Sequence, residues 1–415
     1  MTLSEELLWR GFVQQTTYDE LEELDETVPK FYMGFDASAD SQAIGNLAGM
    51  MFAKTFMRHG CDATLLAGGS TSLIGDPGGK DAERPMQNEE TININIENAK
   101  AELRRVFKGH DFNLVNNLDW TKNLSVLTYL RDIGKHFSMT PLIQRDYIAQ
   151  RIGEGGAGIS YTEFSYGLLQ ALDYLHLYDT HGVTLQLGGS DQWGNCLGGV
   201  ELIRKARGAT AHVITLPLVI NKSTGKKFGK SEDGAVWLDS KKTSPYKFYQ
   251  FWINVDDEGV EDYLKIYTEL DRDSIEELIR QHLEHPGSRV AQKRLALEVT
   301  SIVHGAARAE SVQKVTEVLF GGLEYDSLSK EDINQLEHEL TTVTANYGTE
   351  LADLLVATNL ASSKSEAKRF LKASAVYING YQFSSEKDHI DKEDSLHGFA
   401  IIRRGKNANA LVKFL

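Results

Sequence analysis

Short apolar runs alternate with longer helical stretches and glycine-rich turns through the first half of the chain. Alternation of this kind predicts βαβ units on a parallel sheet. The predicted strands cover residues 31–33, 64–66, 113–115, 185–187 and 213–216. From about residue 244 to 319, apolar residues recur instead at intervals of three and four, and this spacing predicts helices, for example at 273–280 and 290–303.

The chain has 415 residues, more than one hydrophobic core usually supports. We therefore expect an α/β fold that begins with a Rossmann-like parallel-sheet domain over residues 1–243. An α-helical domain is expected over 244–323, and a polar linker with a short helix over 324–348. A small α+β domain is expected over 349–415.

Charge and composition argue against several classes of protein. The net charge of −15 disfavours a protein that coats DNA or other nucleic acid indiscriminately, because such binding depends on neutralising phosphates. No apolar run approaches the ~18 residues of a membrane span, and residues 1–10 do not resemble a secretory signal. Cys61 and Cys196 supply neither a disulfide framework nor a Cys-x-x-Cys metal pair. We expect a soluble cytoplasmic protein that binds no membrane, no DNA and no structural metal.

A basic loop follows the last predicted strand of the first domain. Residues 226–231 read Lys-Lys-Phe-Gly-Lys-Ser, and we call them the lysine loop. Lysine is a compact point charge that can follow a phosphate, and glycine lets the backbone approach closely. The segment is either a polyphosphate site, with Lys227, Lys230 and Ser231 as its ligands, or a solvated basic turn.

One predicted helix carries polar residues among apolar ones. Within residues 161–174, Tyr166, Gln170 and Asp173 stand at positions i, i+4 and i+7 and so share one face. Buried polar groups need partners, and a polar ligand is one such partner. The alternative is that this face of an amphipathic helix points to solvent.

Two glycine-rich segments, 66–79 and 187–195, each follow a predicted strand and contain an aspartate, Asp76 and Asp191. Ligands of doubly wound sheets bind beyond the carboxyl ends of the strands, where glycines let the backbone close on them. Neither segment matches the dinucleotide fingerprint or the Walker A loop. Hydride transfer and ordinary GTPase chemistry thus lose their main support.

Taken in order, these stretches resemble the bacterial-type tyrosyl-tRNA synthetases, which are class I aminoacyl-tRNA synthetases. The resemblance covers nearly the whole chain, and its motifs are highly specific together although each is weak alone. The matching stretches are residues 32–41, 73–78, 164–166, 186–195, 227–231 and 242–252. Tryptophanyl-tRNA synthetase shares the architecture, but Tyr32 together with Asp173 favours a tyrosine substrate.

The resemblance implies a tyrosine–tRNA ligase. Such an enzyme activates L-tyrosine with ATP to tyrosyl-adenylate and pyrophosphate, and then transfers the tyrosyl group to the 3′ end of tRNA(Tyr). Tyr32 and Asp173 would hydrogen-bond the phenol of the substrate. Its ammonium group would be held by Asp76, Tyr166 and Gln170, and its carboxylate would lie near Gln192.

For the nucleotide, the resemblance implies positioning and charge stabilisation, which dominate phosphoryl chemistry. The implied ATP-binding residues are Gly34, Asp36, Gly45, Gly189, Asp191 and Lys230. The implied catalytic residues, with Mg²⁺ sharing the charge of the phosphates, are Lys227, Lys230, Ser231, Ser38, Asn46, Lys80 and Arg84. Surface salt bridges are an equal alternative for Lys80 and Arg84.

One motif departs from the family. Members carry His-x-Gly-His after an Asp-Ser pair, whereas this chain has Ala43-Ile44-Gly45-Asn46. Asn46 can still donate a hydrogen bond, but the methyl group of Ala43 cannot. Either Gln42 or another group compensates, or tyrosine is activated slowly, or activation has been abandoned. We expect a working enzyme, because the tyrosine pocket and the lysine loop are intact.

The C-terminal module points to RNA. Residues 350–415 carry ten Lys or Arg and eight Asp or Glu, in a chain that is otherwise acidic. A helix capped by a serine is predicted from residue 362, followed by a strand and turn at 375–380. This module resembles the alpha-L RNA-binding motif and implies tRNA contacts by Lys364, Lys368, Arg369, Lys372, Arg403 and Arg404. A solvated basic helix is the alternative.

Two other functions remain open at this stage. A catalytically impaired synthetase paralogue acting as an RNA-binding protein would fit Ala43. A nucleotidyltransferase of the same fold that acts on another carboxylic acid would fit the lysine loop. From the resemblance we also expect a homodimer, formed through residues 123–158.

Overall fold

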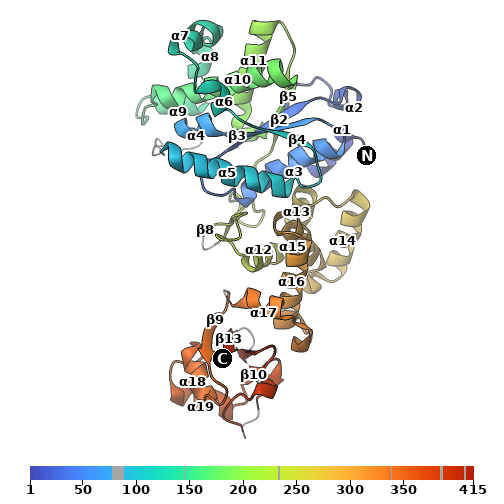
Figure 1. Cartoon of the computed structure of the whole chain (residues 1–415). Coiled ribbons are helices and arrows are strands. Elements are labelled where there is room, and N and C mark those ends of the chain that lie inside the picture. The colour runs from blue at the N-terminus through green and yellow to red at the C-terminus, as the bar shows by residue number, and fades with distance from the viewer. Residues whose placement is uncertain (77–87, 145, 232–233, 338, 384–386, 406–407) are drawn as a thin grey trace. The chain divides into compact units, whose positions relative to one another are not determined.

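The computed structural model describes residues 1–76, 88–144, 146–231, 234–337, 339–383, 387–405 and 408–415. The chain divides into two compact units (Figure 1). The first comprises Met1–Ser244 and Phe251–Val303, and the second comprises Pro245–Gln250 and His304–Leu415. The residues expected to form a separate helical domain, 244–323, are therefore shared between the two units, and the expected boundaries of that domain stay a prediction.

A six-stranded sheet forms the centre of the first unit. Its strands lie in the order β1-β6-β5-β2-β3-β4, and all neighbours are parallel except β1, which pairs with β6 in the antiparallel sense. The strands are β1 (Gln15–Thr16), β2 (Phe31–Asp36), β3 (Ala63–Gly68), β4 (Phe112–Asn116), β5 (Leu185–Gly189) and β6 (His212–Leu216). The five strands predicted from the apolar runs are thus confirmed as β2 to β6, and the parallel sheet with them.

Helices cover both faces of this sheet (Figure 1). On one face lie α3 (Ile44–Arg58) and α5 (Glu89–Val106), and on the other lie α10 (Tyr161–His181) and α11 (Trp193–Arg207). Covering on both sides explains why all six residues of β3 are buried. Helix α10 begins with a capping box in which Ser160 Oγ accepts from the Glu163 amide, and it ends at Gly182, whose φ is +69°.

The remaining helices of the first unit are mostly short. They are α1 (Leu3–Arg10), α2 (Glu23–Thr27), α4 (Gly69–Ile74), α6 (Leu118–Thr121), α7 (Val126–Thr128), α8 (Met139–Ile143), α9 (Asp146–Ile152), α13 (Val260–Tyr267), α14 (Arg272–Glu284) and α15 (Val290–His304). A small two-stranded ribbon begins in the lysine loop, with β7 (Lys230–Ser231) paired to β8 (Gly234–Ala235). The helices predicted at 273–280 and 290–303 are confirmed as α14 and α15. Among the described residues, no helix is long and apolar enough to cross a membrane.

A buried carboxylate ties α1 to α3. Glu6 is 6% exposed and accepts hydrogen bonds from Arg10 Nε at 2.6 Å and His59 Nε2 at 2.7 Å, and it also pairs with Arg58. Burial raises the pKa of this carboxyl, but the hydrogen bonds and the two arginine charges outweigh burial and lower it to about 2. Glu6 is therefore ionised in the folded protein at neutral pH.

The second unit contains a five-stranded sheet in the order β11-β10-β12-β13-β9. Its strands are β9 (Thr341–Ala345), β10 (Val376–Ile378), β11 (Tyr381–Gln382), β12 (Phe399–Arg404) and β13 (Ala408–Phe414). Its helices are α16 (Ala306–Thr316), α17 (Lys330–Leu336), α18 (Leu351–Ala357) and α19 (Lys364–Lys372), together with the first residues of α12 (Pro245–Ile253). Ser363 caps α19, accepting from the Glu366 amide at 3.3 Å.

Residues 324–348 contain the short helix expected there, as α17, and also contain β9, which pairs with β13 in parallel register. The expected bounds of the linker stay a prediction. Successive side chains of a strand point to opposite faces. On β12, Ile402 therefore packs in a core with residues of α18, and Ile401 packs in a second core with residues of α17. The second core includes Tyr325, Leu328, Ile333 and Leu336. The segment itself contains few apolar residues, and the rest of this core comes from distant parts of the chain. The sequence pattern therefore did not reveal it.

Candidate active site

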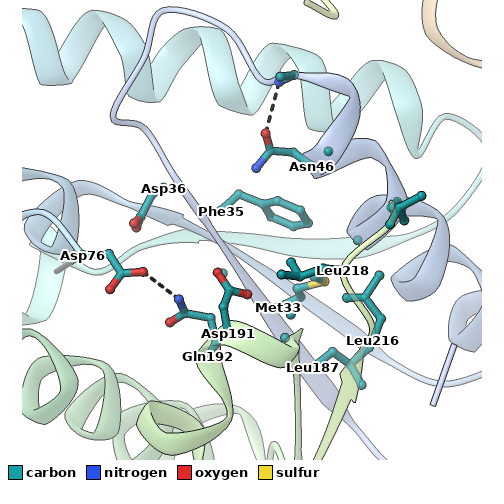
Figure 2. Close-up of a pocket in the computed structure, with 18 of the residues that line it drawn as sticks. Met33, Phe35, Asp36, Asn46, Asp76, Leu187, Asp191, Gln192, Leu216 and Leu218 are labelled. Carbon is teal, nitrogen blue, oxygen red and sulfur yellow. Dashed lines mark hydrogen bonds between the residues drawn. The ribbon is translucent and has the colours of Figure 1, made fainter. Parts of the chain in front are cut away.

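A cavity of about 410 Å³ opens in the first unit (Figure 2). It is lined by β2 and β5, the end of β6, the start of α3, one face of α10 and the lysine loop. The chain leaves β2 toward β3 and β4 on one side of the sheet, and β5 leads to β6 on the other. The cavity therefore lies at the switch point of the sheet, where ligands of such folds bind.

Tyr32 and Asp173 line this cavity, as predicted, and both are buried. The Tyr32 hydroxyl has no hydrogen-bond partner among the described residues. The Asp173 carboxylate accepts from Asn117 Nδ2 at 2.9 Å and from Trp120 Nε1 at 2.8 Å. Each carboxylate oxygen has a second lone pair. A ligand hydroxyl beside Tyr32 could therefore donate to Asp173 and accept from Tyr32.

Burial raises the pKa of Asp173 to about 7, although the hydrogen bonds from Asn117 and Trp120 oppose the shift. These two donors hold the carboxylate in one orientation. Sequence reasoning missed both. A signal was available for Asn117, because this polar residue directly follows the strand β4, just as the glycine-rich segments lie at the ends of β3 and β5.

A second group of polar side chains lines the same cavity. Tyr166 donates its hydroxyl to Asp36 at 3.0 Å, and Gln192 Nε2 donates to Asp76 at 2.6 Å (Figure 2). Gln170 Nε2 donates to Cys196 Sγ at 3.8 Å. The buried Oε1 of Gln170 has no partner among the described residues. Two carboxylates and an amide oxygen in one cavity suit a ligand with an ammonium group.

The glycines expected to approach a nucleotide line the same cavity. A Cβ atom on Gly45 would meet nothing within 4 Å, so it would extend into open space. A Cβ on Gly189 would lie 2.5 Å from Asp191 Oδ1, so only glycine leaves this carboxylate in place. Gly34 and Asp36 of β2 line the cavity as well. In Figure 2, Asp36, Asp76 and Asp191 lie on one side, and Met33, Leu216 and Leu218 lie on the other.

The start of α3 shows how the chain accommodates Ala43. The Asn46 side chain accepts from the Ala43 amide at 3.1 Å (Figure 2), which leaves Nδ2 of Asn46 as a donor. Gln42 does not replace the missing histidine, because it is 4% exposed and donates Nε2 to the Asp36 carbonyl at 2.9 Å. Of the compensations considered from sequence, Gln42 is therefore ruled out.

Ser38 was expected near the nucleotide, but it does not line the cavity. The backbone next to it turns toward α4 and α5. Ser72 Oγ accepts from the Ala37 amide at 2.8 Å, and Asn95 Nδ2 donates to the Ala37 carbonyl at 3.0 Å. These contacts lie more than thirty residues away along the chain, so the local motif did not reveal them.

The lysine loop contributes Lys227, Phe228 and Gly229 to the cavity lining. Gly229 has a φ of +104°, and a Cβ there would lie 3.4 Å from the Gly45 amide nitrogen. The positive φ is the reason for glycine here, whereas a Cβ at 3.4 Å would only just fit against α3. The structure describes Lys230 only by its backbone in β7, and likewise Ser231; their side chains, and all of Lys80 and Arg84, lie outside the described residues.

The basic residues predicted on α19 lie at the surface of the second unit. Three of them pair with acidic neighbours: Lys364 with Asp353 at 2.5 Å, Lys368 with Glu350 at 3.4 Å, and Arg369 with Glu366 at 3.2 Å. Lys372 is exposed. Arg403 lies over the Tyr377 ring at 4.3 Å, and Arg404 lies over Phe370 at 5.1 Å. Because exposed ion pairs are weak, a phosphate could displace these acidic partners.

The carboxylates of the cavity do not form a metal cage. Within the part of the chain that the structure describes, no group of three or more His, Cys, Asp or Glu side chains could hold a metal ion. A divalent ion in this cavity would have to bring other ligands with it, as Mg²⁺ does when it is bound to nucleotide phosphates.

Comparison with known proteins agrees with this geometry. The family of class I tRNA synthetases (W and Y) matches residues 24–321, and the tyrosine–tRNA ligase SYY-like C-terminal domain matches residues 332–412. The tyrosine–tRNA ligase of Geobacillus kaustophilus is 43% identical over 100% of both chains, and tyrosine–tRNA ligase 2 of Enterococcus faecalis is 42% identical over 99% of both. A C-terminally truncated mitochondrial tyrosyl-tRNA synthetase of Aspergillus nidulans superposes with a TM-score of 0.69 at 28% identity, covering 77% of this chain and 94% of that one. The chain therefore belongs to the class I tRNA synthetases and, within them, to the tyrosine–tRNA ligases.

Proposed function

We propose that this chain joins L-tyrosine to tRNA(Tyr) through a tyrosyl-adenylate, with the residue roles given below. The observation that carries the proposal is the pair formed by Tyr32 and Asp173. A buried hydroxyl without a described partner and a carboxylate with remaining acceptor capacity line one cavity. The phenol of tyrosine satisfies both groups. Phenylalanine leaves both unpaired, which is costly for buried polar groups.

In the first step, a carboxylate oxygen of tyrosine attacks the α-phosphorus of ATP, and the bond from that phosphorus to the bridging oxygen of pyrophosphate breaks. Asp76, Tyr166 and Gln170 hold the tyrosine ammonium group, and the Tyr166 hydroxyl also donates to Asp36, which we assign to the nucleotide. Gln192 lies beside the reacting carboxylate. In the second step, a ribose hydroxyl at the 3′ end of the tRNA attacks the tyrosyl carbonyl, and AMP leaves.

The nucleotide lies between the start of α3 and the lysine loop in this proposal. Gly34, Gly45 and Gly189 allow the backbone to approach it, and Asp191 accepts from a ribose hydroxyl. Asn46 Nδ2 and the positive end of the α3 dipole face the phosphates. ATP enters the site with Mg²⁺ bound to its phosphates. Lys227, Lys230 and Ser231 stabilise the departing pyrophosphate. For Lys80 and Arg84 we propose the same role.

The test is tyrosine-dependent exchange of pyrophosphate into ATP, measured with tyrosine, phenylalanine and tryptophan in parallel. The expected result is exchange with tyrosine alone. Tight tRNA binding without exchange would instead indicate an impaired paralogue, and exchange with another acid would indicate a different nucleotidyltransferase.

A matched pair of variants sharpens this test. Tyr32→Phe should raise the KM for tyrosine about 2- to 13-fold, the effect of losing one neutral hydrogen bond. Tyr174→Phe is the control, because its hydroxyl is buried but donates to the His212 carbonyl rather than to the cavity. Equal KM values for both variants would contradict the role of Tyr32.

The C-terminal unit supplies the tRNA contacts in this proposal, and a cytoplasmic location of the protein is part of the same proposal. The contacting residues are Lys364, Lys368, Arg369, Lys372, Arg403 and Arg404. Replacing Lys368 and Lys372 by glutamate should lower aminoacylation of tRNA(Tyr) and leave pyrophosphate exchange unchanged. Loss of exchange in the same variant would contradict the assignment.

We also propose that a second copy of the chain covers residues 123–158. The side chains of Val126 and Leu127 are 72% and 80% exposed, and Met139 and Ile152 add further exposed apolar surface nearby. A contiguous apolar patch marks an interaction site, and a symmetric dimer covers the same patch on both copies. Leu127→Asp should shift the mass in solution from a dimer to a monomer, as measured by light scattering. A wild-type chain that is monomeric at micromolar concentration would contradict the proposal.

A further inference from the structure

Phe228 differs from the other described side chains of the lysine loop. It is 6% exposed, whereas the neighbouring Lys227 is exposed to solvent. Its ring stacks on the ring of Tyr263 in α13, with centroids 4.2 Å apart and planes inclined by 26°. A loop that needs only charge would not require a buried aromatic side chain at its centre.

The pocket that receives this ring is aromatic on several sides. Phe228 lies 5.4 Å from Phe251, 5.6 Å from Trp252 and 5.8 Å from Tyr267, measured between ring centroids. All four residues belong to the first unit. Rings at these distances and tilts attract one another beyond the burial of their area, so the pocket specifies an aromatic ring rather than any apolar side chain.

Polar contacts hold the base of the same segment. Asn221 Nδ2 donates to Asp256 at 2.9 Å, and Lys222 pairs with Asp262 of α13 at 2.5 Å. The Phe228 amide donates to the Val219 carbonyl at 2.9 Å, which closes the turn. The segment from residue 219 to 228 is thus attached to α13 and its preceding connection by Asn221 and Lys222 on one arm and by Phe228 at the end of the other.

These contacts determine where Lys227 can be. Consecutive Cα atoms are ~3.8 Å apart, so Phe228 keeps the Lys227 backbone nearby. Lys227 also pairs with Ile220 in an antiparallel bridge, and it lines the cavity. On its other side, Gly229 contacts the start of α3. A lysine held in place before the reaction loses less conformational entropy in the transition state than one on a free loop.

We propose that Phe228, through its stack on Tyr263, is a positioning residue for adenylate formation that acts by placing Lys227 at the phosphates. This inference rests on the proposed function, since it assigns Phe228 to the first step of that reaction. It predicts an effect on kcat of pyrophosphate exchange rather than on the binding of tyrosine, because the Tyr32 and Asp173 pair is unaffected.

The test compares Phe228→Ala, Tyr263→Ala and Tyr263→Phe in the tyrosine-dependent exchange assay. Phe228→Ala should lower kcat on the order of 10- to 100-fold, as misplacement of a catalytic group by about an ångström does, with the KM for tyrosine changed less than about 2-fold. Tyr263→Ala should behave in the same way. Tyr263→Phe keeps the ring and should retain the parental kcat.

Two controls separate positioning from simple stability. Phe107→Ala removes a buried ring that packs 5.7 Å from Phe112, away from the lysine loop, and should leave kcat unchanged well below its melting temperature. Lys227→Ala combined with Phe228→Ala should be no slower than Lys227→Ala alone, because Phe228 acts through that lysine. Should Phe228→Ala fail to fold, Phe228→Leu keeps apolar volume without the stack and serves in its place.

The outcomes distinguish this inference from the function on which it rests. Absence of exchange in the parent protein would overturn the proposed function. An active parent with an equally active, folded Phe228 variant would overturn only the positioning role. A Phe228 variant whose affinity for tyrosine falls by as much as its kcat would also overturn the positioning role. So would a Phe228→Ala change that slows the Lys227→Ala protein by the same factor as it slows the parent.

Discussion

Replacing Ala43 by histidine should accelerate adenylate formation. Ala43 lines the cavity directly before α3, and its methyl group offers no hydrogen bond. The neighbouring Gln42 is buried and donates to the Asp36 carbonyl, so it cannot reach the nucleotide. An imidazole at this position would add one N–H donor close to Asn46, which is the donor that the structure shows at the start of the helix.

The size of the effect follows from the kind of bond. A hydrogen bond to a charged group contributes roughly 1.5–3 kcal/mol. If the bond forms only in the transition state, kcat rises by about 10- to 150-fold and the KM for tyrosine stays constant. The measurement is pyrophosphate exchange at saturating ATP and tyrosine, with the Ala43→His protein beside its parent.

Ala43→Leu is the matched control, because leucine fills a similar volume without a donor. It should bring no gain. If Ala43→His is also no faster than the parent, an existing group already supplies the stabilisation, and Asn46→Ala would then reveal whether Asn46 is that group. A gain in the leucine variant equal to that of the histidine variant would refute the hydrogen-bond reasoning altogether.

The remaining predictions concern titration and the ribose subsite. Because burial raises the pKa of Asp173 to about 7, the folded protein binds more protons there than the unfolded chain between about pH 4 and pH 7, and stability falls as the pH rises through 7. Asp173→Asn should therefore show a smaller loss of Tm between pH 5 and pH 8 than the parent in thermal melts; identical slopes would contradict this. For Glu6, hydrogen bonding with His59 helps to lower the pKa to about 2, so its stabilisation is present above pH 4.5 and is lost as the pH falls toward 2. Melts of Glu6→Gln between pH 3 and pH 7 should be flatter than those of the parent, and a parallel decline would count against the buried ion pair. Gly189→Ala should displace Asp191, whose Oδ1 would lie 2.5 Å from the added Cβ, and raise the KM for ATP several-fold without changing that for tyrosine; an unchanged KM for ATP would remove Asp191 from the nucleotide site.

Patterns within a few residues were sufficient for much of the fold and part of the site. The five apolar runs became β2 to β6, and the i, i+4, i+7 spacing placed Tyr166, Gln170 and Asp173 together on the cavity face of α10. The serine cap of α19 was also predictable. Such features depend on backbone periodicity and on capping, which are local properties of the chain.

Tertiary packing decided the rest. Asn117 and Trp120 hold Asp173 from more than fifty residues away along the chain, and β9, within residues 324–348, pairs with β13. The aromatic stack of Phe228 belongs to the same class of feature. Sequence patterns show which residues can be buried or can carry chemistry, but the contact partner of each side chain depends on which distant segments the fold brings together. For this protein, the sequence was sufficient to predict which side chains carry the chemistry of the site. The tertiary packing around those side chains decided how they are positioned.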